Sequence, residues 1–191
     1  MENIAARLEK VRVGVAGAGG LGSNAAIALI RTGVQNIVIA DYDKVEESNL
    51  NRQYYFADQV GMPKVEALKT NALRINPDCN ITTHNIKVTP DNIVELFSDC
   101  DVIVEAFDKA DQKIMLIEVL MEQLPHVPLV VGSGMGGWGK SVEIQCKQLG
   151  NVVLCGDFET EVDADHPPLA PRVGIVANMQ ANEVLRLLLE G

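Results

Sequence analysis

Short apolar runs alternate with helical patterns along most of the chain. The run 37–40 (IVIA) has the length and the β-branched content of a buried strand. Farther on, Val65, Leu68, Ala72 and Ile75 recur at spacings of three and four, which is typical of an amphipathic helix. Extending this reading, the expected strands are 13–16, 37–40, 81–86, 101–106, 129–132, 141–147 and 152–154. The expected helices are 1–10, 22–32, 63–75, 90–97, 109–123 and 173–189, and the first of them is expected to pack across the sheet edge.

This alternation predicts an α/β fold with a mostly parallel sheet and helices on both faces. Segment 141–147 alternates polar and apolar residues and is expected to be an antiparallel strand on the C-terminal side. The final helix is apolar around much of its girth, so it is buried inside the fold or in a dimer interface. Segment 156–171 has no core pattern and is expected to be a surface crossover loop. With no repeat or linker, residues 1–191 are expected to form a single domain.

The most informative stretch is the glycine loop after the first strand, GAGGLG at 17–22. Its glycines permit a tight turn and a close approach of the backbone to a ligand. The helix that follows presents free N–H groups and a positive dipole end, which together favour an anion. Asp41 ends the second strand about twenty residues later, which is the spacing of a ribose-binding acid in a Rossmann fingerprint. The sequence therefore predicts a Rossmann-like nucleotide site rather than a glycine turn that only packs a helix on the sheet.

A polar segment, 41–59, follows the second strand and has weak periodicity. Such a segment lies beside the nucleotide in a Rossmann fold. Arg52 is suited to a planar, bidentate grip on phosphate oxygens. Each polar residue taken singly fits a solvated loop equally well, but the set at one strand tip favours a site: Asp41, Asp43, Asn49, Asn51, Arg52 and Gln53.

Two further residues leave alternatives open. Lys64 begins a helix, where the dipole disfavours a cation unless an anion is near, so it is either a phosphate-binding lysine or a solvated one. Asp108 follows the fourth strand and points into the same crevice as Asp41. Its carboxylate could hold Mg²⁺ on triphosphate oxygens, or it could be the N-cap of helix 109–123.

Composition narrows the class of protein. The formal net charge of −10 argues against non-specific binding to nucleic acid or an anionic membrane. No signal segment or membrane-length apolar run is present, which indicates a cytoplasmic protein. The four cysteines form no CxxC pair, so no zinc is expected, and three scattered histidines indicate no catalytic triad.

Taken together, these motifs resemble the ThiF/MoeB/HesA superfamily, which is similar to ubiquitin-activating enzymes. The short, single-domain ThiF type of thiamine biosynthesis is the most similar. Ordinary dehydrogenases have the glycine loop but not the SNLNRQ segment. The resemblance covers nearly the whole chain and rests on 17–22 (GAGGLG), 41–43 (DYD), 48–53 (SNLNRQ), 60–64 (VGMPK), 75–77 (INP), 107–108 (FD), 170–173 (APRV) and 180–182 (QAN).

The resemblance implies an ATP- and Mg²⁺-dependent adenylyltransferase, working as a homodimer. Its substrate would be the C-terminal glycine carboxylate of a ubiquitin-like sulfur carrier protein ending in Gly-Gly, similar to ThiS. The same resemblance implies that Asp108 coordinates Mg²⁺ and that Arg52 and Lys64 act on the phosphates. The implied nucleotide-binding residues are Gly17, Gly19, Gly20, Gly22, Asp41, Asp43, Asn49, Arg52, Gln53 and Lys64.

The chain departs from the family pattern in three places. An N-terminal arginine that reaches the partner's ATP has no match, because Arg7 lies too near the first strand. The paired CxxC zinc motifs of larger relatives are absent. Some relatives bind the carrier covalently through a crossover-loop cysteine, but here Cys155, at the entrance of the loop, is the only candidate and is otherwise a structural thiol.

Two other functions use parts of the same pattern. An NAD-linked oxidoreductase would use the glycine loop and Asp41, but it leaves Arg52, Lys64 and Asp108 unexplained. A non-catalytic nucleotide-binding scaffold for a carrier or tRNA-modifying partner would be indicated by loss of Arg52 or Asp108, and both are present. Adenylation of another target, such as a molybdopterin carrier or a free peptide, also remains open.

Overall fold

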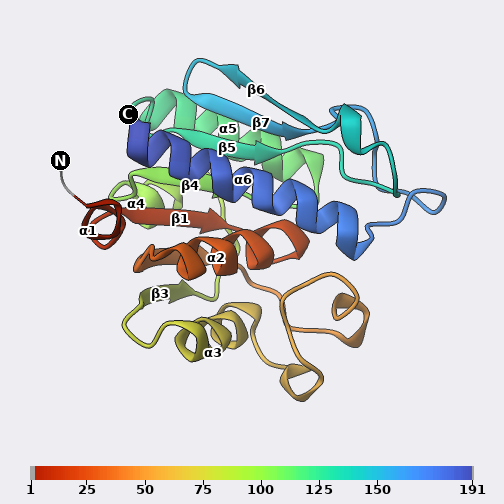
Figure 1. The fold of residues 1–191 in the computed structure, drawn as a ribbon, viewed down its shortest axis with the longest axis horizontal. Coiled ribbons are helices and arrows are strands. Elements are labelled where there is room, and N and C mark those ends of the chain that lie inside the picture. The colour runs from red at the N-terminus through yellow and green to blue at the C-terminus, as the bar shows by residue number, and fades with distance from the viewer. Residues whose placement is uncertain (1–2, 191) are drawn as a thin grey trace.

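The computed structural model describes residues 3–190. Its helices pack around one seven-stranded sheet (Figure 1). The strand order is β3-β2-β1-β4-β5-β7-β6. The strands are β1 (Arg12–Ala16), β2 (Asn36–Ala40), β3 (Asn80–His84), β4 (Val102–Glu105), β5 (Leu129–Gly132), β6 (Gln145–Leu149) and β7 (Val152–Gly156). The α-helices are α1 (Ile4–Leu8), α2 (Gly20–Thr32), α3 (Lys64–Ile75), α4 (Ile93–Phe97), α5 (Ala110–Gln123) and α6 (Ala170–Glu190).

Every strand pairing is parallel except that of β6 with β7. The central strand β1 pairs with β2 on one side and with β4 on the other. The chain therefore builds outward from β1 in one direction and then restarts at β4 in the other. This arrangement confirms the expected α/β fold, with the antiparallel strand on the C-terminal side.

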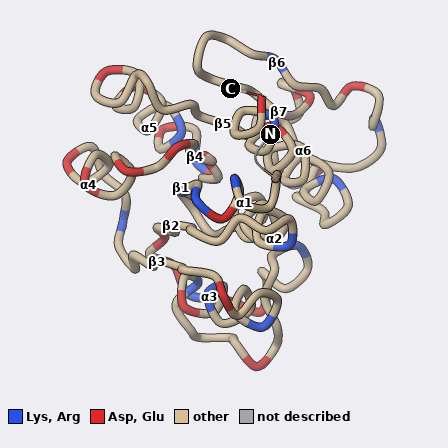
Figure 2. The backbone as a smooth tube through the Cα atoms, turned by 60° about the vertical axis from the view of Figure 1, so that its left-hand side comes forward, with Lys and Arg blue, Asp and Glu red and all other residues tan. Residues whose placement is uncertain are grey.

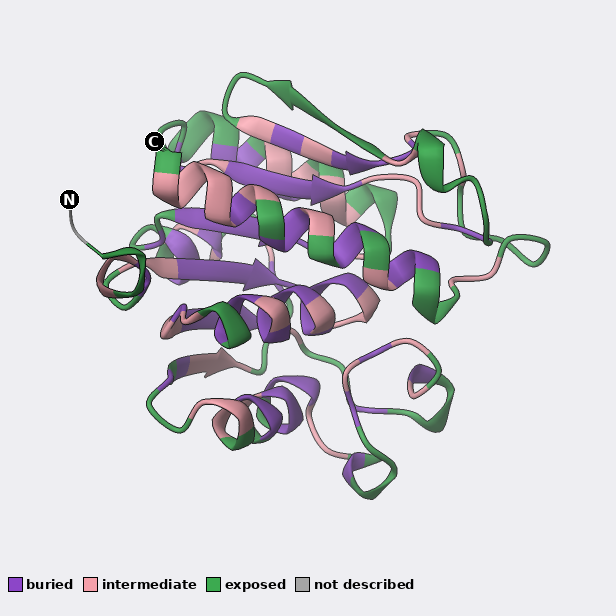
Figure 3. Ribbon diagram, in the orientation of Figure 1, coloured by how far each residue is buried: buried purple, intermediate pink, exposed green. Residues whose placement is uncertain are grey.

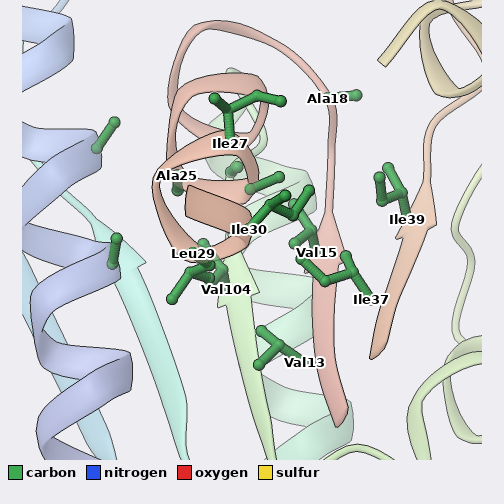
Figure 4. Close-up of a cluster of buried hydrophobic side chains, with 14 of the residues drawn as sticks. Val13, Val15, Ala18, Ala25, Ile27, Leu29, Ile30, Ile37, Ile39 and Val104 are labelled. Atoms are coloured by element: carbon green, nitrogen blue, oxygen red, sulfur yellow. The ribbon is translucent and has the colours of Figure 1, made fainter. Parts of the chain in front are cut away.

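Two apolar layers cover the two faces of the sheet. One buried cluster joins α2, α3 and α6 to the sheet, and the other joins α4 and α5 to it. Figure 4 shows the first cluster, in which Val15 of β1, Ile37 of β2 and Ile30 of α2 lie together. Strands that are apolar on both sides, such as β4, are buried throughout, as a parallel sheet between two helical layers requires (Figure 3). One face of the final helix is buried inside the fold, since α6 packs against α2, whereas Ile175 on the same helix is exposed; a role for α6 in a dimer interface stays a prediction.

The N-terminal helix differs from its expected extent and place. Helix α1 spans only Ile4–Leu8, and residues 1–2 lie outside the described part of the chain. It does not lie at a sheet edge, because it precedes the central strand β1 and contacts α6. The guanidinium of Arg7 donates hydrogen bonds to the carbonyls of Leu188 and Leu189, at 2.8 and 2.9 Å. Arg7 therefore caps the carbonyl end of α6, where a cation is favoured.

The expected strand 141–147 was misplaced. Ser141–Glu143 form a 3₁₀ turn instead, and β6 starts at Gln145 and continues to Leu149. Lys140 has a positive φ of 50°, which turns the chain just before this segment. All five residues of β6 are exposed. The alternation of polar and apolar residues in this stretch therefore does not correspond to one buried and one exposed face. Pairing with β7 sets the position of the strand instead.

Smaller boundary differences occur elsewhere. α4 begins at Ile93 rather than Pro90, and α6 begins at Ala170, with Pro171 in its first turn. Acidic and basic residues are interspersed over the helices and loops (Figure 2). No helix within the described residues is long and apolar enough to cross a membrane.

Candidate active site

A pocket of about 490 Å³ opens at the carboxyl ends of the central strands, which is within the usual range for a small-molecule site. It lies where the strand order reverses, as expected for a ligand site in an open α/β sheet. Nine of the residues expected from the sequence line it: Gly17, Gly19, Gly20, Asp41, Asp43, Arg52, Gln53, Lys64 and Asp108. Gly22 and Asn49 do not line it.

The glycine loop is shaped by close backbone contacts. Gly17 has a φ of +99°, and a Cβ added there would lie 2.8 Å from the carbonyl oxygen of Ala106. At Gly22 an added Cβ would lie 1.9 Å from the carbonyl oxygen of Gly17. Gly22 therefore allows the start of α2 to pack against the loop, although it does not face the pocket. No side chain caps the N-terminus of α2 at Gly19, so this end of the helix presents its dipole to the pocket.

Two carboxylates from the end of β2 form one wall of the pocket. Asp41 accepts hydrogen bonds from the amides of Ala18, at 2.6 Å, and Asp43, at 2.8 Å. It thereby connects the glycine loop to the polar segment. Behind this wall the Tyr55 hydroxyl donates to the Ala18 carbonyl at 2.7 Å. Burial, followed by the charges of Asp41 and Asp43, raises the pKa of Tyr55, so it stays a neutral donor.

Lys64 is not a solvated lysine. Only 6% of its surface is exposed, and its Nζ lies 2.9 Å from Oδ2 of Asp43. This carboxylate is the anion that offsets the unfavourable position of a cation at the start of α3. Lys64 also lines the pocket, so its charge faces any anionic ligand that binds there.

Arg52 and Gln53 are held by a tight turn that Asn49 organises. The side-chain oxygen of Asn49 accepts a hydrogen bond from the Glu46 amide at 3.0 Å. The Asn49 backbone carbonyl accepts hydrogen bonds from the amides of Arg52 and Gln53. The structure thus gives Asn49 a positioning role behind the pocket; direct contact with phosphate stays a prediction. Gln53 is 9% exposed, and its Oε1 has no hydrogen-bond partner within the described residues. A buried acceptor without a partner fits a ligand that brings a hydroxyl or N–H donor.

The structure excludes one of the two expected roles of Asp108, and Mg²⁺ coordination stays a prediction. The N-cap of α5 is Lys109, without a side-chain hydrogen bond, so the capping role of Asp108 was wrong. Its carboxylate lines the pocket and makes no hydrogen bond or ion pair with the part of the chain the structure describes. No group of three metal-ligating side chains occurs among the described residues. One free carboxylate in this pocket nonetheless fits Mg²⁺, which binds through one or two protein carboxylates and completes its shell with ligand phosphates and water.

A buried ion pair below the pocket was missed by the sequence analysis. Glu105 is fully buried, and its Oε2 lies 2.7 Å from Nζ of Lys113 on α5. Its other oxygen accepts the amide of Phe107 at 2.6 Å, and Lys113 also donates to the Gly132 carbonyl at 3.1 Å. Burial raises the pKa of Glu105, while Lys113 opposes that shift. The pair fixes the turn that presents Asp108. A glutamate that ends an apolar strand was the only sign of it in the sequence.

Two loops border the pocket, namely the glycine-rich loop 133–139 after β5 and the crossover segment 156–171. Met135 reaches it from the glycine-rich loop, and Val162 and Pro168 reach it from the crossover segment. Asp157 and Arg172, both buried, form an ion pair across the crossover segment, and Arg172 also donates to the Gly139 carbonyl at 2.6 Å. The crossover segment is therefore anchored at both ends beside the pocket.

Cys155 is a poor candidate for a covalent intermediate. It is fully buried, does not line the pocket, and its Sγ lies 3.4 Å from that of Cys146. Burial raises its pKa, which lowers the thiolate fraction, and its sulfur does not reach a carrier bound in the pocket. The structural alternative is the one that fits.

Comparison with known proteins identifies the family. The sequence model of the ThiF family matches residues 2–191. This chain belongs to the ThiF family. Among curated ThiF relatives, the adenylyltransferase and sulfurtransferase UBA4 of Candida glabrata is 30% identical over 190 residues, covering 96% of this chain and 43% of that protein. The sulfur carrier protein ThiS adenylyltransferase of Bacillus subtilis is 36% identical over 136 residues, covering 70% of this chain and 40% of that one.

A third ThiF relative is named for a different reaction. The tRNA threonylcarbamoyladenosine dehydratase of Escherichia coli is 36% identical over 141 residues, covering 73% of this chain and 52% of the enzyme. A crystal structure of an E. coli enzyme of that name, in complex with AMP, matches with a TM-score of 0.90 and 26% identity, covering 99% of this chain and 90% of that one. Another, in complex with ATP, matches with a TM-score of 0.89. This chain spans about half or less of the length of these curated relatives.

Proposed function

We propose that this protein is an ATP- and Mg²⁺-dependent adenylyltransferase that activates a carboxylate. The observation that carries the proposal is the pocket itself. It combines a glycine loop and an uncapped helix start with two cations, Arg52 and Lys64, and the unpaired carboxylate of Asp108. An NAD-linked oxidoreductase needs the loop and Asp41 but has no use for the other three side chains. The naming of relatives as adenylyltransferases supports the same choice.

The nucleotide would bind with its ribose at Asp41 and its phosphates along the glycine loop. The unpartnered Oε1 of Gln53 offers an acceptor to a donor group of the ligand. Arg52 makes two hydrogen bonds through Nη1, to the Ser48 carbonyl and to Asn51, which leaves the other guanidinium donors for phosphate oxygens. Lys64 would exchange part of its interaction with Asp43 for the triphosphate.

The chemistry requires positioning and charge neutralisation rather than a protein base. A substrate carboxylate is already ionised near neutral pH and can attack the α-phosphorus directly. Pyrophosphate leaves, and negative charge grows on its oxygens as the bond breaks. Arg52 and Lys64 are placed to stabilise that charge and to align the phosphates. Asp108 would hold Mg²⁺, which supplies additional positive charge to the phosphate oxygens when bound.

For the substrate we propose the C-terminal glycine of a ubiquitin-like sulfur carrier protein ending in Gly-Gly, similar to ThiS, in thiamine thiazole biosynthesis. A relative named as a ThiS adenylyltransferase supports this carrier. A tRNA is the second candidate, because the structural neighbour with the TM-score of 0.90 is named for a tRNA reaction. The net charge of −10 opposes it, since binding to RNA depends on cations that neutralise phosphates. We also expect the protein to act as a cytoplasmic homodimer.

Mass spectrometry of the substrate tests this assignment. The protein is incubated with ATP, Mg²⁺ and a ThiS-like carrier, and the carrier is trapped with hydroxylamine, which converts an acyl adenylate to a hydroxamate. We expect the hydroxamate on the intact carrier but not on a control carrier that lacks its terminal Gly-Gly. If neither carrier gives a hydroxamate and ATP consumption depends on tRNA, the carrier proposal is overturned in favour of a tRNA substrate.

A further inference from the structure

Two cysteines face each other on the outer hairpin of the sheet. Cys146 of β6 lies directly opposite Cys155 of β7 in the antiparallel register, and their Sγ atoms are 3.4 Å apart. Residues opposite one another in such a pair have Cα atoms about 4.5–5.5 Å apart. That range falls within the roughly 4.4–6.8 Å that disulfides span, so a bond can form without moving the backbone.

The two thiols differ in their access to solvent. β6 is the edge strand of the sheet, and all five of its residues, including Cys146, are exposed (Figure 3). Cys155 is fully buried beneath it. A small oxidant would therefore meet Cys146 first, and Cys155 would be its nearest thiol. The other two cysteines, Cys79 and Cys100, are buried just before β3 and β4, and neither of these strands adjoins β6 or β7.

We propose that Cys146 and Cys155 form a redox modification site at which a peroxide closes an intramolecular disulfide. The Cys146 sulfur attacks one oxygen of hydrogen peroxide, which breaks the O–O bond, gives a sulfenic acid at Cys146 and releases one water. The Cys155 sulfur then attacks the sulfenic sulfur. The S–S bond forms as the S–O bond breaks, and the hydroxyl leaves with the Cys155 proton as a second water. In total, two thiols are oxidised and one peroxide is reduced.

The position of the pair gives the modification a structural consequence. Cys155 is followed by Gly156 and Asp157, and Asp157 holds the crossover segment by pairing with Arg172. A disulfide would bind the edge strand covalently to the strand from which that segment leaves. Neither cysteine lines the nucleotide pocket. We therefore expect ATP binding to persist in the oxidised protein, so this proposal can fail or succeed independently of the adenylyltransferase function.

The test counts and maps thiols in the native, full-length chain. Purified reduced protein is treated with hydrogen peroxide, quenched with catalase, and alkylated with iodoacetamide after denaturation, before peptide mapping. We expect alkylation to be lost at Cys146 and Cys155 together, with a dithiothreitol-sensitive peptide that links them. Cys79 and Cys100 should remain alkylated.

Serine variants provide matched controls. Cys146→Ser and Cys155→Ser should each abolish the linked peptide, whereas Cys79→Ser should leave it at the wild-type yield. Retention of all thiols under peroxide would overturn the proposal. Oxidation of Cys146 to sulfinic acid, or dimers joined through Cys146 of two copies, with Cys155 still alkylated, would also overturn it, because either result shows that the buried thiol does not resolve the sulfenic acid.

Discussion

The buried ion pair of Glu105 and Lys113, below the pocket, permits a quantitative test of its contribution to folding stability. Lys113→Met removes the cation 2.7 Å from a fully buried carboxylate and leaves the Phe107 amide as a neutral donor to Glu105. Removing one member of a buried pair costs about 3–5 kcal/mol of folding free energy. The Lys113 side chain is 21% exposed, so we expect the lower end, about 3 kcal/mol.

The loss of stability should depend on pH, with a definite sign. Burial already raises the pKa of Glu105, and removing Lys113 removes the leading influence that opposes this shift. A carboxyl group with a higher pKa in the folded state binds protons more tightly when folded. The free energy of unfolding therefore falls as pH rises from the pKa of Glu105 in the unfolded chain to its higher pKa in the folded protein. Above the folded-state pKa the loss is complete. The variant should lose more stability relative to wild type at pH 8 than at pH 5.

Urea unfolding followed by far-ultraviolet circular dichroism at both pH values measures this loss. The matched control is the double variant Glu105→Gln with Lys113→Met, in which neither of the two positions carries a charge. It should recover at least half of the lost free energy. A loss under about 1 kcal/mol in the single variant, or an equal loss at both pH values, would refute the reasoning, because it would show that solvent or another group compensates the carboxylate.

Three substitutions test the pocket and the glycine loop beside it. Asp108→Ala should abolish Mg²⁺-dependent turnover and leave the thermal midpoint unchanged, because the side chain is unpaired at a strand end; full activity would show that the metal assignment is wrong. Arg52→Ala should weaken the binding of ATP and of pyrophosphate together by about 10–140-fold, from the roughly 1.5–3 kcal/mol of hydrogen bonds to a charged group, and an unchanged ATP affinity in calorimetry would remove Arg52 from the site. Gly22→Ala should cost about 2 kcal/mol or more in urea unfolding, since its Cβ would meet the Gly17 carbonyl at 1.9 Å; wild-type stability would contradict that contact.

The parts of this molecule that follow local rules were predictable from the sequence. The parallel strands are continuous apolar runs, because both faces of the sheet are covered, and such runs stand out from their surroundings. The glycine loop and Asp41 also predicted where the pocket lies, because each follows the carboxyl end of a parallel strand. Edge strand β6 was misplaced because its exposed residues carry no burial pattern.

Interactions between distant segments could not be predicted in the same way. Lys113 pairs with Glu105 only because α5 folds back over β4, and Asp157 meets Arg172 only when the crossover segment returns to α6. The sequence shows these residues as isolated charges. Lys64 is an intermediate case: its conflict with the helix dipole indicated an anion, but only the structure identifies Asp43 as that anion.

The most direct test of the proposed activity is ATP–pyrophosphate exchange with Mg²⁺, with and without a carrier that ends in Gly-Gly. The proposal predicts labelled ATP that forms from pyrophosphate only when the carrier is present, because the exchange requires reversible formation of the acyl adenylate. No exchange with any carrier, in a protein that binds ATP, would contradict adenylation and favour a nucleotide-binding scaffold. Tight binding of NAD without binding of ATP would contradict the nucleotide assignment itself.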